Sequence, residues 1–493
     1  MRFNSNKDLD NVTILQGLEE LAESADFIHY KNEGKPVTYY VNYFKSLIDV
    51  EILHRDILPY ISKNRSTELK KIKNEIPVEV VMETSDVNLI KEKIFRGFIY
   101  VQFKNDLSTG LLIRAELKSL RNVTSPEVEF SVLGPKEAFV ESYELNLNMI
   151  RSRLPDAQLR VKQFKIGTLS KTKVGLLYME GITNEENVRT VEERLKTIEI
   201  DVVNGISNIS ELISDNGFSP FPQLIDTERP DRTCAGLAEG KVVIIMDRAP
   251  NVLLGPTSIV EFFSSFEDYY IHWILASMFR LIRVMAVCLS IIATPIYVAV
   301  LTYHHELLPQ DLIGTLVTSR RNVPFPPILE AIILELTIEL LREAGARLPT
   351  KIGQTIGIVG GIVIGTAAVQ AGLTSNILLI IVALSALGSF TTPIYTIGNT
   401  IRLIRFPLLL LASLFGLLGV VISGGFIIAH LIQLKSLNRP YLEPIYPFRL
   451  GDFRDAIVRL TIKERNMRPQ YLRTQKPVRF IKKELKKRRD IYE

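Results

Sequence analysis

Charge is spread very unevenly along this chain, and that unevenness limits its possible folds more than any other feature. Residues 278–434 carry only 15 charged side chains in 157 positions, whereas the other 336 residues carry 98. Long segments with few charges are typical of membrane-embedded chains. We therefore expect a soluble half followed by a membrane half, and the length leaves room for roughly two to four domains.

Four uncharged stretches in the charge-poor region are long enough to cross a bilayer. A helix rises about 1.5 Å per residue, so roughly 20 residues cross a hydrocarbon core of about 30 Å. These stretches predict an α-helical polytopic membrane domain over residues 281–434, and the longest of them has room to tilt. The four expected spans are residues 284–303, 352–370, 377–395 and 406–434.

An apolar helix with acidic interruptions is expected over residues 326–348, between the first two spans. At 100° per residue, Glu335, Glu339 and Glu343 fall within about 80° of one another and form one stripe. Ionisable groups at membrane depth usually face a cavity or a partner, so one interpretation is a carboxylate lining for a cation path. The alternative is an interfacial helix whose glutamates touch water or pair with arginines of the same helix.

The second expected span has two different faces. One face carries three overlapping Gly-x-x-x-Gly units, which let another helix approach closely in a bilayer. These glycines are Gly353, Gly357, Gly361 and Gly365. The opposite face alternates polar and apolar side chains, as a pore wall with a hydrophobic constriction would. This second set consists of Thr355, Val359, Ile362, Thr366 and Gln370. The alternative is a helix packed on all sides, whose hydroxyls bond back to their own carbonyls.

The number of membrane crossings stays open at this point. Four spans put both termini inside but place Arg402 and Arg405 outside, against the positive-inside tendency. Counting the acidic helix as a fifth span moves these arginines inside but places the C-terminal tail outside. We favour four spans plus one membrane-embedded amphipathic helix.

Residues 435–493 are expected to form a basic tail on the cytosolic side. Positions 449–493 hold 15 basic and 6 acidic side chains, with a lysine and arginine cluster over residues 482–489. Such a cluster suits anionic lipid headgroups at the membrane surface. We do not expect nucleic-acid binding, because the tail leaves a membrane bundle and interleaves few aromatic residues.

Two α/β subdomains are expected in the soluble half. Residues 1–35 are polar and lack a signal-peptide core, which predicts a flexible cytosolic arm. The first subdomain, residues 36–134, has short apolar runs bounded by turn residues, with a hairpin near Asn105. Its expected strands are residues 78–82, 98–103, 111–115 and 128–133.

The second subdomain is expected over residues 135–255, with residues 256–280 as a connector. Its pattern alternates strands and helices, which favours some parallel pairing. The helices are expected over residues 135–155 and 188–198, and the strands over residues 174–178 and 242–246.

No catalytic, cofactor or metal site is expected. The sequence has no Gly-rich loop ending in Lys-Ser/Thr, no Cys-x-x-Cys pair and no His-Glu-x-x-His. The charged segment 227–232 is interpreted as a solvated loop with local ion pairs rather than a ligand clamp. The sequence therefore does not predict an enzyme.

Several segments taken together resemble the A subunits of GerA-type spore germinant receptors, in order from about residue 130 to 448. They include Pro256-Thr257-Ser258, Phe262-Phe263, Glu267-Asp268-Tyr269-Tyr270, Val323-Pro324-Phe325-Pro326, Glu339 to Gly345, Gly134-Pro135-Lys136-Glu137 and Phe221-Pro222-Gln223.

This resemblance implies a multi-pass protein of the spore inner membrane, with its N-terminal domain and C-terminal tail in the cytosol. It also implies three partners: a transporter-like B subunit, a lipoprotein C subunit and further copies of the A subunit. The implied function is an oligomeric, germinant-gated cation channel. Two alternatives stay open, namely a secondary transporter, for which we see no inverted repeat, and a non-conducting scaffold subunit.

Overall fold

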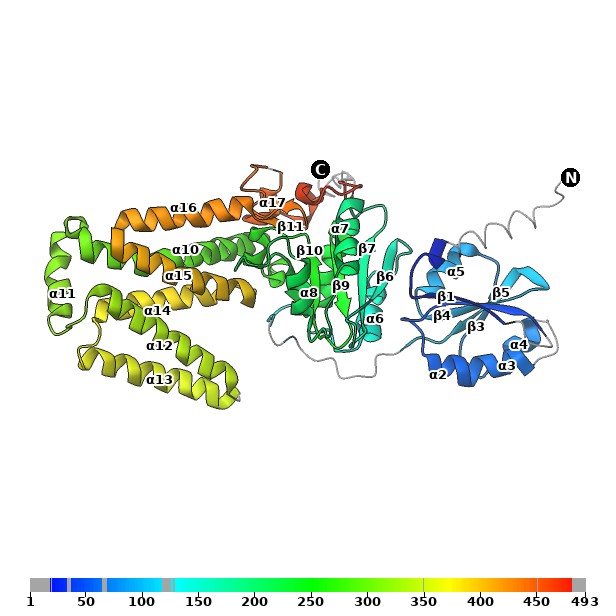
Figure 1. The fold of residues 1–493 in the computed structure, drawn as a ribbon. Helices are drawn as coiled ribbons and strands as arrows, with labels where there is room; N and C mark the ends of the chain where they lie inside the picture. The colour runs from blue at the N-terminus through cyan, green and yellow to red at the C-terminus, as the bar shows by residue number, and fades with distance from the viewer. Residues whose placement is uncertain are drawn as a thin grey trace, which may run out of the picture.

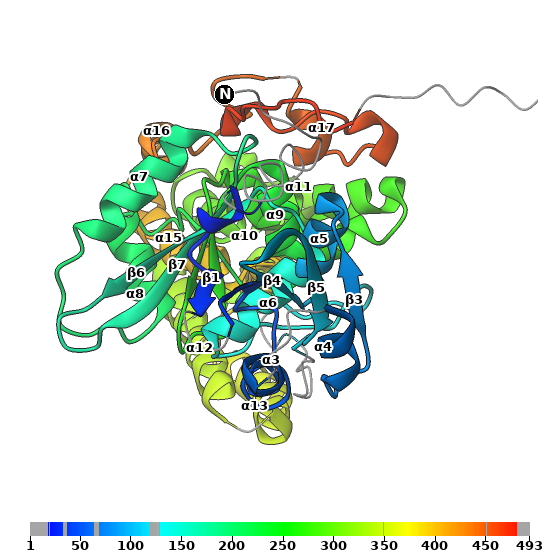
Figure 2. The same cartoon turned by 90° about the vertical axis from the view of Figure 1, so that its right-hand side faces the viewer.

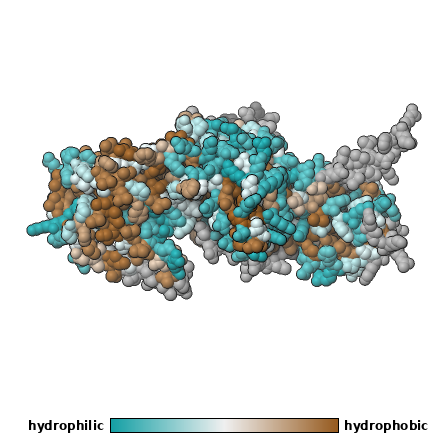
Figure 3. Space-filling view, in the orientation of Figure 1, coloured by the Kyte–Doolittle hydropathy of each residue, from teal (hydrophilic) through white to brown (hydrophobic). Residues whose placement is uncertain are grey.

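The computed structural model describes residues 18–480 except 19, 33–36, 64–68, 118–125, 127–128, 349 and 450. The chain forms three bodies in a row: a first α/β domain, a second α/β domain and a helical half (Figure 1). The surface changes accordingly, from largely hydrophilic over the two α/β domains to mostly hydrophobic over the helical half (Figure 3).

The first domain is built on a five-stranded antiparallel sheet with the order β1-β2-β4-β5-β3. Its strands are β1 (Phe27–Asn32), β2 (Tyr39–Phe44), β3 (Val81–Thr84), β4 (Phe98–Phe103) and β5 (Asp106–Arg114). All six residues of β4 are buried because helices cover both faces of the sheet. These helices are α2 (Val50–Ile52), η1 (Leu53–Ile57), α3 (Leu58–Lys63) and α4 (Leu69–Glu75) on one face and α5 (Val87–Ile94) on the other.

Two expectations for this region are wrong. The arm expected over residues 1–35 contains β1, which pairs with β2 along its whole length. Only Phe27 of this strand is buried, so an edge strand of this kind shows little apolar alternation. The strand expected over residues 128–133 is also absent, since its described residues, 129–133, belong to no sheet.

The second domain has a sheet with the order β6-β7-β9-β10-β8. Its strands are β6 (Leu159–Ile166), β7 (Thr172–Met179), β8 (Ile225–Thr227), β9 (Val242–Met246) and β10 (Val252–Gly255). Every pair in this sheet is antiparallel, so the expected parallel pairing is wrong. Two helices, β8 and a third helix separate β7 from β9 along the chain, so the alternation of strands and helices in the sequence does not fix the direction in which β9 returns.

Helices cover both faces of this second sheet. The pair α6 (Tyr143–Arg153) and α9 (Pro230–Glu239) packs on one face, and the pair α7 (Glu185–Lys196) and α8 (Ile206–Ile213) packs on the other. The helix expected over residues 135–155 begins only at Tyr143. The Asn146 side chain bonds to the backbone N–H and C=O of Val140, which keeps the preceding segment out of the helix.

The helical half contains seven α-helices over its described residues. They are α10 (Trp273–Tyr303), α11 (Gln310–Arg320), α12 (Pro327–Arg347), α13 (Thr350–Gln370), α14 (Asn376–Phe390), α15 (Tyr395–Phe415) and α16 (Leu417–Gln433). By length and composition, α10 and α15 could cross a membrane, while residues 360–370, α14 and α16 are shorter apolar helices. A single span over residues 406–434 is wrong, because Gly416, with φ +62°, ends α15 and α16 turns back along it.

The C-terminal segment packs against the second domain instead of leaving as a free tail. After the short strands β11 (Lys435–Ser436) and β12 (Arg439–Pro440), Tyr441 and Leu472 are fully buried, and Ile259 donates its N–H to the carbonyl of Tyr441. Figure 2 shows this segment along one side of the molecule. The helical half therefore starts and ends beside the same domain. The basic cluster at 482–489 lies outside the described residues.

Candidate functional site

The acidic stripe of α12 lies against arginines. Glu335 and Arg405 form a buried ion pair of 2.5 Å between α12 and α15. Arg405 also donates to the hydroxyl of Ser290 at 2.6 Å, and Thr294 donates to Glu335 at 3.2 Å. A buried charge that has both a counter-charge and hydrogen bonds is compatible with a packed interior. Glu335 is therefore an interior residue that joins three helices.

The other two glutamates of the stripe are closer to the surface. Glu339 pairs with Arg342 of its own helix at 2.7 Å and with Arg402 of α15 at 3.1 Å. Glu343 pairs with Arg347 at 2.6 Å, and both side chains are exposed. Pairing within α12 is thus present at two of the three positions. The cation path stays a prediction for these residues.

A further buried pair lies at the opposite end of α12. Glu330 accepts from Arg320 of α11 at 2.7 Å and from the backbone N–H of Ser375, the residue before α14, at 3.1 Å. The sequence shows these charges but not their partners, which lie 10 and 45 positions away. For the ion pairs between α12 and α15, the sequence did offer one indication. Arg402 and Arg405 lie three positions apart in an otherwise apolar helix, and such arginines need acidic partners.

Helix α13 lies at the outer edge of the helical half, beside α12 (Figure 1). Ile362 is 62% exposed, and Thr366 and Gln370 are also exposed. The Thr366 hydroxyl donates back to the carbonyl of Ile362 at 2.7 Å. The side chains of Thr355 and Val359 lie outside the described part of the chain. The described members of the polar stripe therefore face away from the interior of their own chain.

The glycines of α13 differ in their surroundings. A Cβ at Gly361 would meet nothing within 4 Å, and one at Gly365 would touch Leu379 at 3.7 Å. The surroundings of Gly353 and Gly357 are not among those described. The expected interhelical contact at Gly361 is therefore not made within the single chain.

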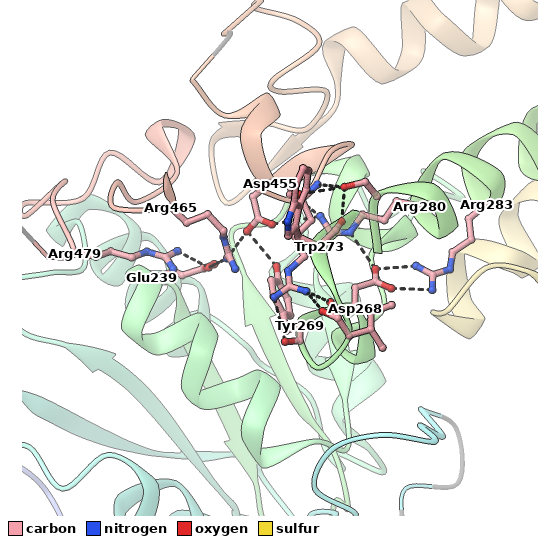
Figure 4. A network of polar contacts seen from close by, with 12 residues as sticks. Glu239, Asp268, Tyr269, Trp273, Arg280, Arg283, Asp455, Arg465 and Arg479 are labelled. Atoms are coloured by element: carbon pink, nitrogen blue, oxygen red, sulfur yellow. Dashed lines mark hydrogen bonds and ion pairs between the residues drawn. The ribbon is translucent and has the colours of Figure 1, made fainter. Parts of the chain in front are cut away.

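A polar network, which we call the clasp, ties together the second domain, the connector, α10 and the C-terminal segment (Figure 4). Its centre is Asp268, 1% exposed, which accepts from Arg280 at 3.0 Å and from Arg283 at 2.8 Å. Arg280 also reaches Asp455 at 3.4 Å. The clasp thus holds the first turns of α10 against the C-terminal segment at Asp455.

The outer part of the clasp extends to α9. Arg465 pairs with Asp455, and Arg479 pairs with Glu239 at 2.6 Å. Burial acts to raise the pKa of Glu239, but the charges of Arg479, Lys241 and Arg465 outweigh it and hold that pKa below its usual value. Burial raises the pKa of Tyr269, which donates to Asp455 at 3.2 Å, to about 12. Over the described residues, no group of three His, Cys, Asp or Glu side chains is placed to hold a metal ion.

The charged segment 227–232 is buried, so its interpretation as a solvated loop is wrong. Arg229 is 2% exposed and pairs with Asp231 at 2.7 Å. Arg232 pairs with Glu129 at 2.6 Å, and Thr227 donates to the same carboxylate at 2.5 Å. The local ion pairs exist, but they fasten residues 129–131 to the domain.

Comparison with known proteins gives a consistent result over almost the whole chain. The family described as Bacillus/Clostridium GerA spore germination protein matches residues 16–471. The chain is 46% identical over 479 residues to spore germination protein GerQA of Bacillus cereus, covering 97% of this chain and 96% of that one. It is 37% identical over 463 residues to spore germination protein A1 of Bacillus subtilis (strain 168), covering 92% and 94%.

A solved structure of lower similarity is also found. The crystal structure of the N-terminal domain of the A subunit of the Bacillus megaterium spore germinant receptor GerK3 is 24% identical, with a TM-score of 0.36. The match covers 49% of this chain and 92% of that one.

Proposed function

Since the chain belongs to the Bacillus/Clostridium GerA spore germination protein family, we propose that it is the A subunit of a spore germinant receptor. We propose further that several copies together form a germinant-gated cation channel in the spore inner membrane. A transporter-like B subunit and a lipoprotein C subunit would complete the receptor. The basic cluster at 482–489 would contact anionic lipid on the cytosolic face.

The outward position of α13 is the observation that carries the channel proposal. Ile362 and Thr366 combine an apolar constriction with a hydroxyl on one exposed face, and a lone chain leaves this face open. Copies arranged around an axis would enclose it, and ions would then pass along a polar wall with one dewetting segment. Gly361, with no neighbour within 4 Å, leaves space for a helix of another copy.

The arrangement of charge supports a membrane position for the helical half. Arg402 lies in the half of α15 nearer the second domain, where Thr400 donates to the carbonyl of Pro220 at 2.5 Å, whereas Arg405 lies at the middle of the helix. With that domain in the cytosol, Arg402 falls on the cytosolic side, in line with the positive-inside tendency. If α12 also crosses, the start of α15 lies on the cytosolic side, and the division of the stretch 406–434 between α15 and α16 returns the C-terminal segment to that side as well.

Ion flux through the purified protein tests this proposal. The full chain would be reconstituted, with its receptor partners, into vesicles loaded with potassium, and release would be followed with and without germinant. We expect germinant-dependent release, and unregulated release from an Ile362→Ala variant because a shorter side chain admits water. A receptor that binds germinant but never conducts, even with Ile362→Ala, would instead support a non-conducting scaffold.

A further inference from the structure

The segment over residues 129–133 has its polarity reversed relative to an ordinary soluble surface. Phe130 and Val132 are 69% and 70% exposed, and Leu133 is 46% exposed. Glu129 and Ser131, which alternate with them, face the domain instead. A surface segment of a soluble domain normally shows the opposite pattern, with polar side chains outside.

This reversal is fixed by specific contacts. Glu129 accepts from Thr227 and Arg232, and the Ser131 hydroxyl accepts from Arg229 at 2.5 Å. Each of these donors belongs to the buried charged segment at the start of α9. Phe130, between these two anchors, and Val132, directly after the second, therefore have a defined outward direction, and their exposure does not result from a loosely held loop.

The same segment abuts the start of α10. Leu133 donates its N–H to Glu267 at 3.2 Å, and the ring of Tyr270 lies so close to Gly134 that a Cβ there would be 2.6 Å from it. Gly134 also has φ +103°, which favours glycine. Helix α10 begins three residues after Tyr270 and exposes Ile274, Leu275 and further apolar side chains along its length. The apolar segment thus continues the apolar surface of α10.

A second loop repeats this arrangement beside the other end of the helical half. Phe218 is fully exposed, although its N–H is held by the Asn216 side chain at 3.0 Å. The next residue, Ser219, bonds to His430 in the last turn of α16 at 2.8 Å, and Phe221 packs against the same imidazole. An exposed aromatic side chain therefore lies where α16 ends, just as Phe130 lies where α10 begins.

We propose that these two loops, residues 129–133 and 216–220, insert their apolar side chains into the headgroup region of the cytosolic leaflet. The partner is thus a lipid surface. Aromatic side chains favour this zone because it accommodates an apolar body beside polar groups. A second copy of the chain is less well supported, because the loops border the ends of two different helices, α10 and α16, and a bilayer surface is the common neighbour of both. The inference rests on the proposed membrane position of the helical half.

Depth-dependent fluorescence quenching tests this proposal on the full chain in liposomes. Trp273 is the single tryptophan, so Trp273→Phe supplies a silent background. Into it are placed, one at a time, Phe130→Trp and Phe218→Trp as probes of the loops. Met285→Trp, 63% exposed on α10, probes the proposed span, and Tyr30→Trp, 50% exposed in the first domain, reports water.

The expected result is that lipids brominated near the headgroup quench the emission of both loop probes, Phe130→Trp and Phe218→Trp. Lipids brominated at the chain ends should quench the Met285→Trp probe best and the loop probes least, while the Tyr30→Trp probe should respond only to aqueous acrylamide. Blue-shifted loop emission that no brominated lipid quenches would overturn the proposal in favour of a contact between proteins. Loop emission that behaves like the Tyr30→Trp probe would overturn it in favour of water. An unquenched Met285→Trp probe would instead refute the membrane position itself.

Discussion

Arg405 of α15 and Glu335 of α12 form a 2.5 Å ion pair inside the helical half, with side chains only 3% and 4% exposed. Arg405 also donates to Ser290 of α10. One guanidinium therefore connects three helices that are far apart in the sequence. Within a bundle that has little polar surface, this pair fixes how α12 lies against α15. Its removal should therefore lower the stability of the protein.

Glu335→Gln should destabilise the protein strongly, because it leaves the Arg405 charge buried without a counter-charge, at a cost of about 3–5 kcal/mol. The double variant Glu335→Leu with Arg405→Met should recover most of that loss, since a well-packed apolar pair is often no less stable. Thermal unfolding in detergent measures both. Glu343→Gln, which breaks an exposed pair, is the control and should change stability by less than about 1 kcal/mol. A double variant as unstable as Glu335→Gln would contradict this account.

Ile362→Ala should make spores lose potassium without germinant at normal receptor abundance. In the proposed channel, a shorter side chain at the dewetted constriction would admit water. Spore potassium and receptor abundance would be measured together. A core position would behave differently, with a cavity cost of about 2–5 kcal/mol and less protein in the membrane. Because Ile362 is largely exposed within its own chain, we expect little change in abundance.

Gly361→Leu should reduce assembly of the A subunit without unfolding the single chain. A Cβ at this position meets nothing within 4 Å in the chain itself, whereas bulk at a close helix contact between copies would separate them. Oligomer size in mild detergent gives the answer. Gly314→Leu on α11, another helical glycine with open space around it, is the matched control. Equal oligomer size for both variants would show that the glycine face is not an interface.

Asp268→Asn should open the clasp, because it removes the charge that Arg280 and Arg283 share. Loss of one partner from such a buried cluster costs about 3–5 kcal/mol. We expect trypsin to cut the C-terminal segment near Arg465 faster than in the parent protein, as local opening exposes it. Asp56→Asn, which breaks an exposed pair with Arg55, should leave the cleavage rate unchanged. Equal rates for both variants would mean that the clasp does not hold this segment.

Asp226 should make the second domain less stable as the pH rises from 4 to 6. Burial raises its pKa to about 6, and nearby Glu129 and Glu228 add to the rise against the hydrogen bond from Asn251. The folded state then holds the proton that the unfolded state, with a pKa near 3.9, releases, so stability is lost through this window. Asp226→Asn should gain up to about 3 kcal/mol at pH 7 and almost nothing at pH 4. The free energy of unfolding of both proteins would be measured at the two pH values. An equal difference between Asp226→Asn and the parent protein at pH 4 and pH 7 would contradict this prediction.

The sequence was most informative where one local pattern decided the structure. β4 occupies the expected residues because a continuous apolar run fits a strand covered on both faces, and α12 lies close to its expected range. The stretch 406–434 misled because its apolar run is uninterrupted on both sides of Gly416. Composition cannot locate a turn between two segments that are equally apolar. The turn lies at a single glycine, which adopts a positive φ.

The contacts that build the candidate site join residues far apart along the chain. Arg405 lies 70 positions from Glu335, and Arg280 lies 175 from Asp455. Charges at these positions were visible, but their pairing depends on packing that no local period encodes. The alternating apolar pattern at Phe130 and Val132 predicts a strand, but the segment forms none and these side chains point outward. Alternation alone does not say which face of a segment is covered.

The second domain is joined to the helical half at three places: at the beginning of α10 through the clasp, at the end of α16 through His430, and near the start of α15 through Thr400. A body held at one point can swivel in every direction, whereas each further attachment removes a direction of movement. Any movement of this domain must therefore move the near ends of α10, α15 and α16 together. A force applied to the second domain is thus passed to three helices at once.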